Sequence, residues 1–131
     1  LLAWLMLSAY ATVQLLLSDY VQHYGLARRR LSASMLDATY EPVGPQHSWN
    51  APHWFSSALM LHAPRHSDHH AHPARPYPAL RLPEAQEAPM LPYALPVMAT
   101  IALAPSLWRR VMHPRLAPWR DGGAAPPITR V

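Results

Sequence analysis

Uncharged apolar stretches alternate along this chain with polar loops rich in histidine, proline and arginine. The first stretch opens the chain: residues 1–17 carry no charge, and the first charged residue is Asp19. About 18 apolar residues suffice to cross a bilayer as a helix, so we predict a transmembrane helix over residues 1–26. Three arginines follow at residues 28–30 and place this end of the helix in the cytoplasm by the positive-inside rule. A buried helix of a soluble core is the alternative.

A second helix is expected over residues 51–72. The connector before it, residues 31–51, is broken by proline and glycine, which prevent long regular structure. Pro52 suits the first turn of a helix and Asn50 its N-cap. Pro64 interrupts the pattern, and a kink is predicted there because proline lacks the N–H that continues a helix.

Residues 88–108 form a second uncharged stretch that contains several prolines, and a helical segment is expected over residues 88–112. Arginines lie on both sides of it, so a single crossing would leave one set outside the cell. We therefore expect a segment that returns, lies at the membrane interface or packs against other helices. Residues 1–115 would form one unit. Residues 116–131, rich in glycine and proline, are predicted to be a poorly ordered tail.

Composition supports a membrane protein. Half of the 131 residues are hydrophobic, 14% are charged, and the net charge is +4 with arginine as the only basic residue besides histidine. The arginines flank apolar stretches and form no continuous stripe, which argues against nucleic-acid binding. The absence of cysteine excludes disulfides, thiolate zinc sites and iron–sulfur clusters. Because the chain begins without methionine inside an apolar run, we expect a fragment, and the opening is no signal peptide.

Three histidines carry the clearest chemistry. His66, His69 and His70 stand at i, i+3 and i+4, which on a helix places their imidazoles on one face. Neutral imidazole is the commonest side-chain metal ligand and suits iron, copper, zinc and nickel. Asp68 falls on the opposite side, so we assign it a supporting role at most. His62, one turn before His66, is expected to support the site or line its pocket.

A fourth histidine lies near the predicted membrane boundary. His23 falls in the last turn of the first helix, one turn after Asp19 on the same face. Ionisable groups at membrane depth are functional candidates. A histidine at this position could also extend to the interface or favour the helix C-terminus, so spacing alone leaves both interpretations open.

Four motifs together resemble a known family. Arg-His-Ser-Asp-His-His-Ala at residues 65–71 resembles the last histidine box of the integral-membrane alkane hydroxylases, which are relatives of the membrane fatty-acid desaturases. Asp-Tyr-Val-Gln-His-Tyr-Gly-Leu at residues 19–26 resembles that family's Asn-Tyr-x-Glu-His-Tyr-Gly-Leu signature. His-Ser-Trp-Asn at 47–50 and Leu-Trp-Arg-Arg-Val-Met at 107–112 follow in the family's order. The resemblance runs from about residue 7 to residue 115.

The resemblance implies a fold and a site. The fold would be part of an all-α membrane protein: a transmembrane helix, a histidine-box helix at the cytoplasmic face and a proline-interrupted apolar segment. The site would hold two irons through histidines that include His23, His66, His69 and His70. Asp19 and Gln22 stand where the family has Asn and Glu, which leaves the surroundings of His23 less certain than its role as a ligand.

The resemblance also implies an activity. A membrane non-haem di-iron monooxygenase would use O2 to hydroxylate the terminal carbon of an alkane, with electrons from a rubredoxin-like donor. It would be a multi-pass protein of the bacterial inner membrane with its site facing the cytoplasm. Four histidines are too few for two irons, so we expect the upstream boxes of HExxH and EHxxxHH type to lie elsewhere in a full-length relative, and these 131 residues alone to be inactive.

Two other interpretations stay open at this point. The first is a desaturase or another hydroxylase of the same superfamily that acts on acyl chains, because an HxxHH box fits it equally. The second is a non-catalytic, histidine-rich metal-binding or membrane-anchoring segment. A soluble zinc hydrolase is weaker, since the chain has no HExxH motif.

Overall fold

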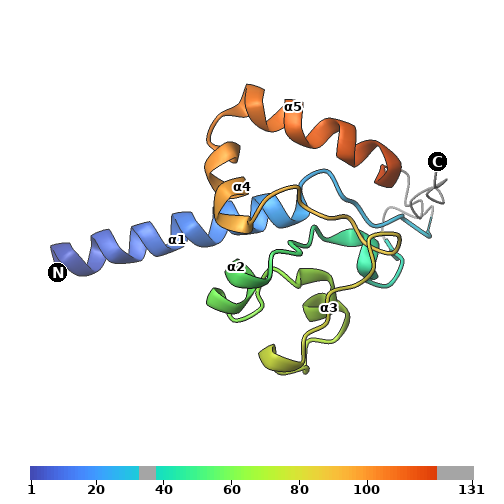
Figure 1. Ribbon diagram of the computed structural model, residues 1–131, viewed down its shortest axis with the longest axis horizontal. Coiled ribbons are helices and arrows are strands. Elements are labelled where there is room, and N and C mark those ends of the chain that lie inside the picture. Colours follow the sequence, from blue (N-terminus) through green and yellow to red (C-terminus); the bar gives the residue numbers. More distant parts are fainter. Residues whose placement is uncertain (33–37, 121–131) are drawn as a thin grey trace.

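The computed structural model describes residues 1–32 and 38–120, and this part of the chain is helical and contains no β-strand. Five α-helices follow one another in Figure 1: α1 (Leu2–His23), α2 (Trp54–Leu59), α3 (His66–Ala71), α4 (Leu95–Ala102) and α5 (Pro105–Leu116). Three 3-10 turns join or extend them: η1 (Pro45–His47), η2 (Tyr77–Ala79) and η3 (Ala117–Trp119). Isolated bridges pair Arg30 with Tyr40 and Asn50 with Met90. The expected all-α fold class is confirmed.

Helix α1 is the one described helix that is long and apolar enough to cross a membrane. None of its most apolar 18-residue window is buried inside the structure, whereas the core helix of a soluble protein would be mostly covered. Its first residues project beyond every other element in Figure 1. Only Val21 and Gln22, near its C-terminal end, are buried. The predicted candidate for a transmembrane helix is therefore present, with its apolar side chains free to contact lipid.

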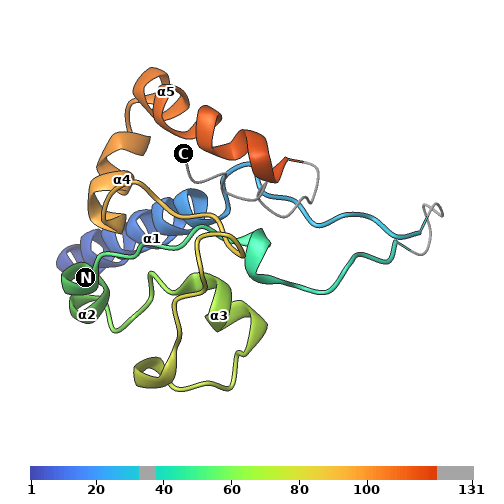
Figure 2. The ribbon, with the colours of Figure 1, turned by 45° about the vertical axis from the view of Figure 1, so that its right-hand side comes forward.

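The core gathers around the C-terminal end of α1. There α4 packs against α1 and α5 packs against α4, and Figures 1 and 2 show α5 leading away from α4 toward the C-terminal end of α1. Tyr24 forms the centre of an aromatic group, because its ring contacts Trp108 edge-on and its carbonyl accepts the indole N–H of Trp49 at 2.9 Å. The buried apolar residues of this core are Val21, Trp49, Ala51, Leu91, Leu95, Met98, Trp108, Met112, Leu116 and Trp119.

A glycine turns the chain directly after α1. Gly25 has a φ of +70°, a left-handed conformation that side chains other than glycine rarely adopt. A Cβ at this position would also lie 2.3 Å from the Cδ2 atom of Leu116, so the Leu116 side chain would have to shift. The Tyr-Gly-Leu part of the motif at residues 19–26 thus has a structural cause.

The single helix expected over residues 51–72 forms as two short helices, α2 and α3. Leu61 and His62 separate them, with φ values of 50° and 62° that no α-helix contains. Pro64, which has no N–H to continue the hydrogen-bond ladder, follows directly, so the predicted interruption is a complete break. Asn50 also differs from its expected place: the N-cap of α2 is His53, and Asn50 binds α3 instead.

The expected apolar segment over residues 88–112 turns back on itself between α4 and α5, and α4 packs on α1. Residues 116–120, which were expected to belong to a poorly ordered tail, are part of the folded structure. Leu116 and Trp119 are buried in the core, and the side chain of Leu116 packs against the turn at Gly25. The remainder of that tail, from residue 121, lies outside the described residues.

Candidate metal centre

Three histidine side chains converge where α3 meets the end of α1. The Nε2 atom of His66 lies 3.1 Å from that of His23 and 3.0 Å from that of His70. Each of the three can offer a ligand atom such that all lie within 4.8 Å of one another. Nitrogens this close, from elements 43 residues apart in sequence, match what a single metal ion requires of its ligands.

The local structure explains the convergence. His23 is the last residue of α1, and His66 and His70 are one turn apart at the two ends of the short helix α3. The rings of His66 and His70 stand edge to face with centroids 4.4 Å apart, and both are about 5 Å from the ring of His23. The i, i+4 spacing noted in the sequence therefore places the two α3 histidines against the histidine of α1.

His69 lies beside this group but outside it. Its ring centroid is 6.1 Å from that of His66 and 5.6 Å from that of His70. The structure thus brings together three of the four predicted ligands, and the fourth is adjacent to them. Asp19 also lies at the margin, with its Oδ1 atom 3.6 Å from the Nε2 atom of His23.

The surroundings of His66 and His70 keep these two imidazoles in the neutral form that binds metal. Burial, together with the nearby rings of His70, His23 and His69, lowers the pKa of His66 to about 3. Burial, followed by His23 and His69, also lowers the pKa of His70. Only neutral imidazole has a free nitrogen lone pair for a metal. The donor set therefore fits a metal ion of the kind that histidine binds.

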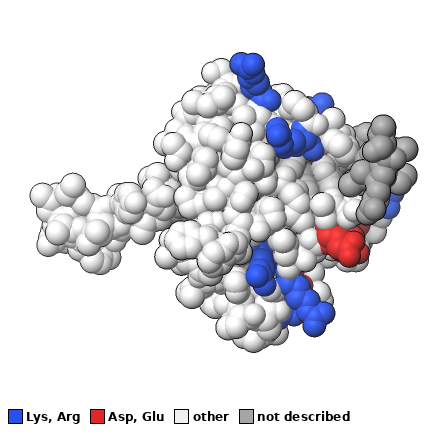
Figure 3. Space-filling view, in the orientation of Figure 1, with Lys and Arg blue, Asp and Glu red and all other residues white. Residues whose placement is uncertain are grey.

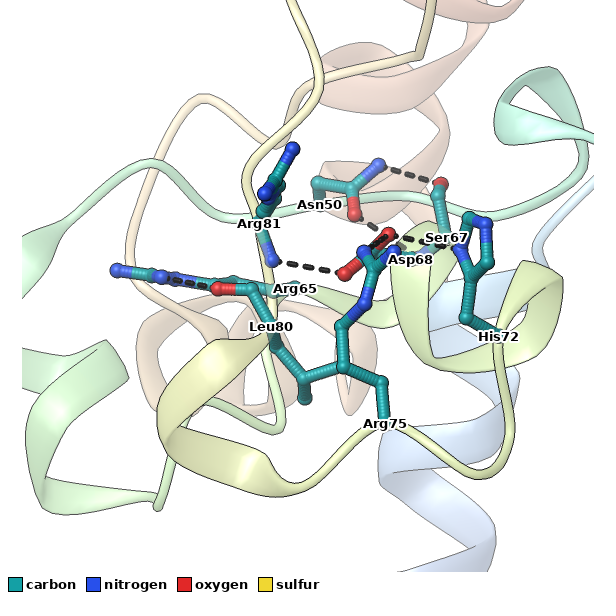
Figure 4. Close-up of polar contacts among 8 residues, drawn as sticks. All are labelled: Asn50, Arg65, Ser67, Asp68, His72, Arg75, Leu80 and Arg81. Atoms are coloured by element: carbon teal, nitrogen blue, oxygen red, sulfur yellow. Dashed lines mark hydrogen bonds and ion pairs between the residues drawn. The ribbon is translucent and has the colours of Figure 1, made fainter.

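A buried asparagine fixes the start of α3, as Figure 4 shows. The Oδ1 atom of Asn50 accepts the backbone N–H of Ser67 at 3.0 Å, and its Nδ2 atom donates to the Ser67 hydroxyl at 2.7 Å. That hydroxyl donates in turn to the carbonyls of Pro45 and Ser48. Arg65, the N-cap of α3, makes no side-chain cap, so Asn50 satisfies a helix-start N–H from 17 residues away.

On the opposite face of α3, polar contacts hold the helix to the loop that follows it. Asp68 accepts hydrogen bonds from the Arg75 guanidinium, from the backbone N–H of Arg81 at 2.8 Å and from the His72 ring at 3.0 Å (Figure 4). Arg65 donates to the carbonyl of Leu80. Burial raises the pKa of Asp68, but the bonds from Arg81, Arg75 and His72 outweigh it and leave that pKa below its usual value. As the spacing predicted, Asp68 faces away from the converging imidazoles.

The two remaining predicted site residues hold the scaffold. Gln22 donates from Nε2 to the carbonyl of Ala63 at 3.2 Å and accepts from the hydroxyl of Ser18. It thereby fastens the segment before α3 to the last turn of α1. The Nδ1 atom of His62 lies 3.1 Å from the Ser57 hydroxyl, and His62 is not among the three converging histidines.

Two cavities flank α3. The smaller, about 260 Å³, adjoins the cluster and is lined by His23, Leu26, Arg28, Val43, His47, Ser48 and His70. The larger, about 430 Å³, lies on the side of Asp68 and Arg75. Since two of the three converging histidines, His23 and His70, line the smaller cavity, that one is the candidate site for chemistry.

His47 is buried, and both of its ring nitrogens have partners within the protein. Its Nδ1 atom accepts the backbone N–H of Gly44 at 2.9 Å, and its Nε2 atom lies 3.0 Å from Oε1 of Glu41. Both ring nitrogens are thus committed to protein groups, which excludes this ring as a ligand in this arrangement. The roles of Asn50 and Glu41 escaped sequence reasoning, because each acts on a residue distant in sequence.

Comparisons with known proteins agree with this geometry. Residues 1–102 match the family model described as fatty acid desaturase. The chain is 40% identical over 114 residues to an alkane 1-monooxygenase of Pseudomonas putida and to alkane 1-monooxygenase 1 of Alcanivorax borkumensis, in each case across 87% of this chain and 27% of the relative. It is 40% identical over 98 residues to an alkane 1-monooxygenase of Acinetobacter baylyi, across 75% and 22% of the two lengths. The chain thus spans about a quarter of these relatives' length. The sequence-based recognition is confirmed: the chain belongs to the fatty acid desaturase family.

Proposed function

We propose that these residues form part of a membrane monooxygenase that uses O2 to hydroxylate the terminal carbon of alkanes. The observation that carries the proposal is the convergence of His23, His66 and His70 at the end of an apolar helix. The relatives named alkane 1-monooxygenase support this reaction over desaturation. The reaction consumes an alkane, O2, two electrons and two protons and yields a primary alcohol and water.

Iron is the proposed metal, held by His23, His66 and His70 with His69 beside them. Imidazole nitrogens suit non-haem iron, and when bound the metal would supply the activation of O2. Two irons need more ligands than these four histidines provide. The remaining ligands would come from parts of the full-length protein outside residues 1–131.

The chain's own residues would hold the ligands and guide the substrate. Asn50 and Gln22 fix α3 against α1, so the ligand nitrogens are placed before metal binds. Pre-organised ligands lower the cost of binding. A long alkane dissolves best among lipid tails, and α1 leads from that layer directly to His23. The substrate would thus reach the site without passing through water.

An acidic, rubredoxin-like carrier is the proposed electron donor, and the side of the membrane is proposed with it. Arg28 lines the cavity that His23 and His70 also line. The arginines at 28–30 follow α1 directly, which favours a cytoplasmic position at the bacterial inner membrane. A positive rim steers an acidic carrier toward the site.

The test uses the full-length protein in membranes, with an electron-transfer system and a series of n-alkanes. We expect two irons per chain by elemental analysis and 1-alkanols by mass spectrometry. Alkenes as the main product, or a protein that binds zinc and turns over no alkane, would overturn the proposal. Residues 1–131 expressed alone should hydroxylate nothing; activity from them would contradict the idea that further ligands are required.

A further inference from the structure

Helix α2 buries its polar side chains and exposes its apolar ones, the reverse of the pattern of a water-soluble protein. Its two small polar residues, Ser56 and Ser57, are buried, while its large apolar residues point outward. The outward residues are Trp54, Phe55, Leu59 and the following Leu61, which are 77, 65, 74 and 67% exposed. We call these four residues the α2 apolar surface. A soluble protein rarely exposes a contiguous apolar patch of this kind without a partner.

The buried serines are satisfied within the protein, so the inversion is a stable arrangement. The hydroxyl of Ser56 donates to the carbonyl of His53 at 3.1 Å, and that of Ser57 lies 3.1 Å from Nδ1 of His62. The ring of Trp54 packs edge to face against that of Phe55. The apolar side chains are thus left for an external environment.

Continuity with α1 identifies that environment. The segment that joins α2 to α3 is fastened to the last turn of α1 by the bond from Gln22 to Ala63. Figures 1 and 2 both place α2 beside α1 and nearer to its N-terminus than α3 is. A helix of 22 residues is about 33 Å long, close to the hydrocarbon thickness of a bilayer, so its C-terminal end reaches the interface. The α2 apolar surface therefore lies at or just inside the depth where lipid headgroups meet acyl chains.

The distribution of charge agrees. No Asp, Glu, Lys or Arg occurs between Glu41 and Arg65, the segment that contains α2. In Figure 3 the charged side chains lie away from the projecting end of α1. Tryptophan and other aromatic residues favour the membrane interface, where interfacial helices bury their apolar faces.

We propose that the α2 apolar surface inserts into the membrane leaflet in which the C-terminal end of α1, at His23, lies. The occupant is the phospholipid bilayer itself, at the boundary of headgroups and acyl chains. Together with α1, this second contact fixes the depth of the histidine cluster relative to the lipid tails. The inference needs α1 to span a membrane, but it does not rest on the proposed monooxygenase activity.

Site-directed spin labelling tests the proposal in the full-length protein reconstituted in phosphatidylethanolamine–phosphatidylglycerol vesicles. Residues 1–131 contain no cysteine, so single cysteines can be introduced once any cysteine elsewhere is replaced by serine. Nitroxides at Phe55→Cys and Leu59→Cys report on the surface. Glu84→Cys serves as the water reference and the buried Ser57→Cys as the protein-covered reference. Collision rates with O2, which concentrates in lipid, and with a water-soluble nickel chelate give the environment of each label.

The proposal predicts high O2 collision rates for the labels at Phe55 and Leu59. Their collision rates with the nickel chelate should be at least about threefold lower than that of the label at Glu84. Nickel collision rates equal to those at Glu84 would show a surface in water. Low rates with both reagents, as at Ser57, would show that another protein segment covers it. Either result overturns the proposal, and neither depends on whether the protein hydroxylates alkanes.

Discussion

The two faces of helix α3 differ in the partners of their polar groups. On one face, Ser67 and Asp68 are bonded to backbone and side-chain groups from four other segments. On the other, the Nε2 atoms of His66 and His70 point toward each other and toward His23. The first face can be explained by the folded chain alone. On the second face the imidazole nitrogens contact one another and not the scaffold, and this is the arrangement that a shared metal ion would require.

This contrast separates scaffold from site. Groups that are satisfied internally hold α3 in position, and their value is the stability they provide. Groups that converge without enough partners cost stability, which is typical of functional sites. A bound metal ion would make the converging imidazoles of the second face stabilise the folded protein. The two faces should therefore respond to mutation in different measurements, metal content for one and unfolding for the other.

The largest effect is expected from His66→Ala in the full-length protein. His66 contacts both other converging histidines, so its loss removes the middle one of the three proposed ligands. Changing even a supporting residue of a metal site costs about 10–100-fold in affinity, and a ligand should cost at least that much. Iron content and alkanol formation should both fall to background. The matched control is His72→Asn on the Asp68 side, which should keep both; equal losses in the two variants would contradict the assignment.

Asn50→Ala should give the next largest effect and link the two faces. It leaves the buried N–H of Ser67 without its acceptor and removes the donor to the Ser67 hydroxyl, and an unsatisfied buried group costs about 1–3 kcal/mol. The thermal midpoint should fall, and iron content should fall with it because α3 loses its anchored start. Asn50→Asp keeps an oxygen for the Ser67 N–H and should restore part of both. Lowered stability with unchanged iron affinity would show that Asn50 does not position the ligands.

Asp68→Asn should lower stability and spare the metal. The amide oxygen can still accept the N–H of Arg81, but the charged pairing with Arg75 is lost, at a cost of about 1–2 kcal/mol. Unfolding monitored by circular dichroism in detergent should show the loss, while elemental analysis should show unchanged iron. A variant that folds but has lost its iron would break the proposed independence of the two faces.

The sequence predicted what depends on local pattern. The uncharged run before Asp19 predicted α1, and the i, i+4 spacing of His66 and His70 predicted a shared face. What it missed depends on contacts between distant segments. Nothing local reveals that Asn50 caps a helix 17 residues away, or that Leu61 adopts a positive φ and splits the expected helix. The meeting of His23 with α3 came from the family resemblance, since spacing alone left its role open.

The smallest effect is expected from the contact of Glu41 with His47. Like Ser67 and Asp68, the His47 ring is bonded to other groups of the protein. Its partner Glu41 accepts the N–H of Arg29 and a bond from His47, and these two contacts lower the pKa of Glu41 against the opposing effect of burial. A lowered folded-state pKa means that Glu41 stabilises the protein above the ordinary glutamate value near 4.5 and that this contribution disappears as pH falls through the lowered pKa.

Glu41→Gln should therefore lower the thermal midpoint slightly at neutral pH, and the difference from the unmodified protein should vanish in acid. The exposed Glu84, changed to Gln in the same way, should leave the midpoint unchanged at both pH values. Iron content should be unaffected, because both nitrogens of His47 are committed to protein groups and none is offered to the metal. If Glu41→Gln instead removed iron, His47 would belong with the converging histidines, and the division between satisfied and unsatisfied imidazoles would fail.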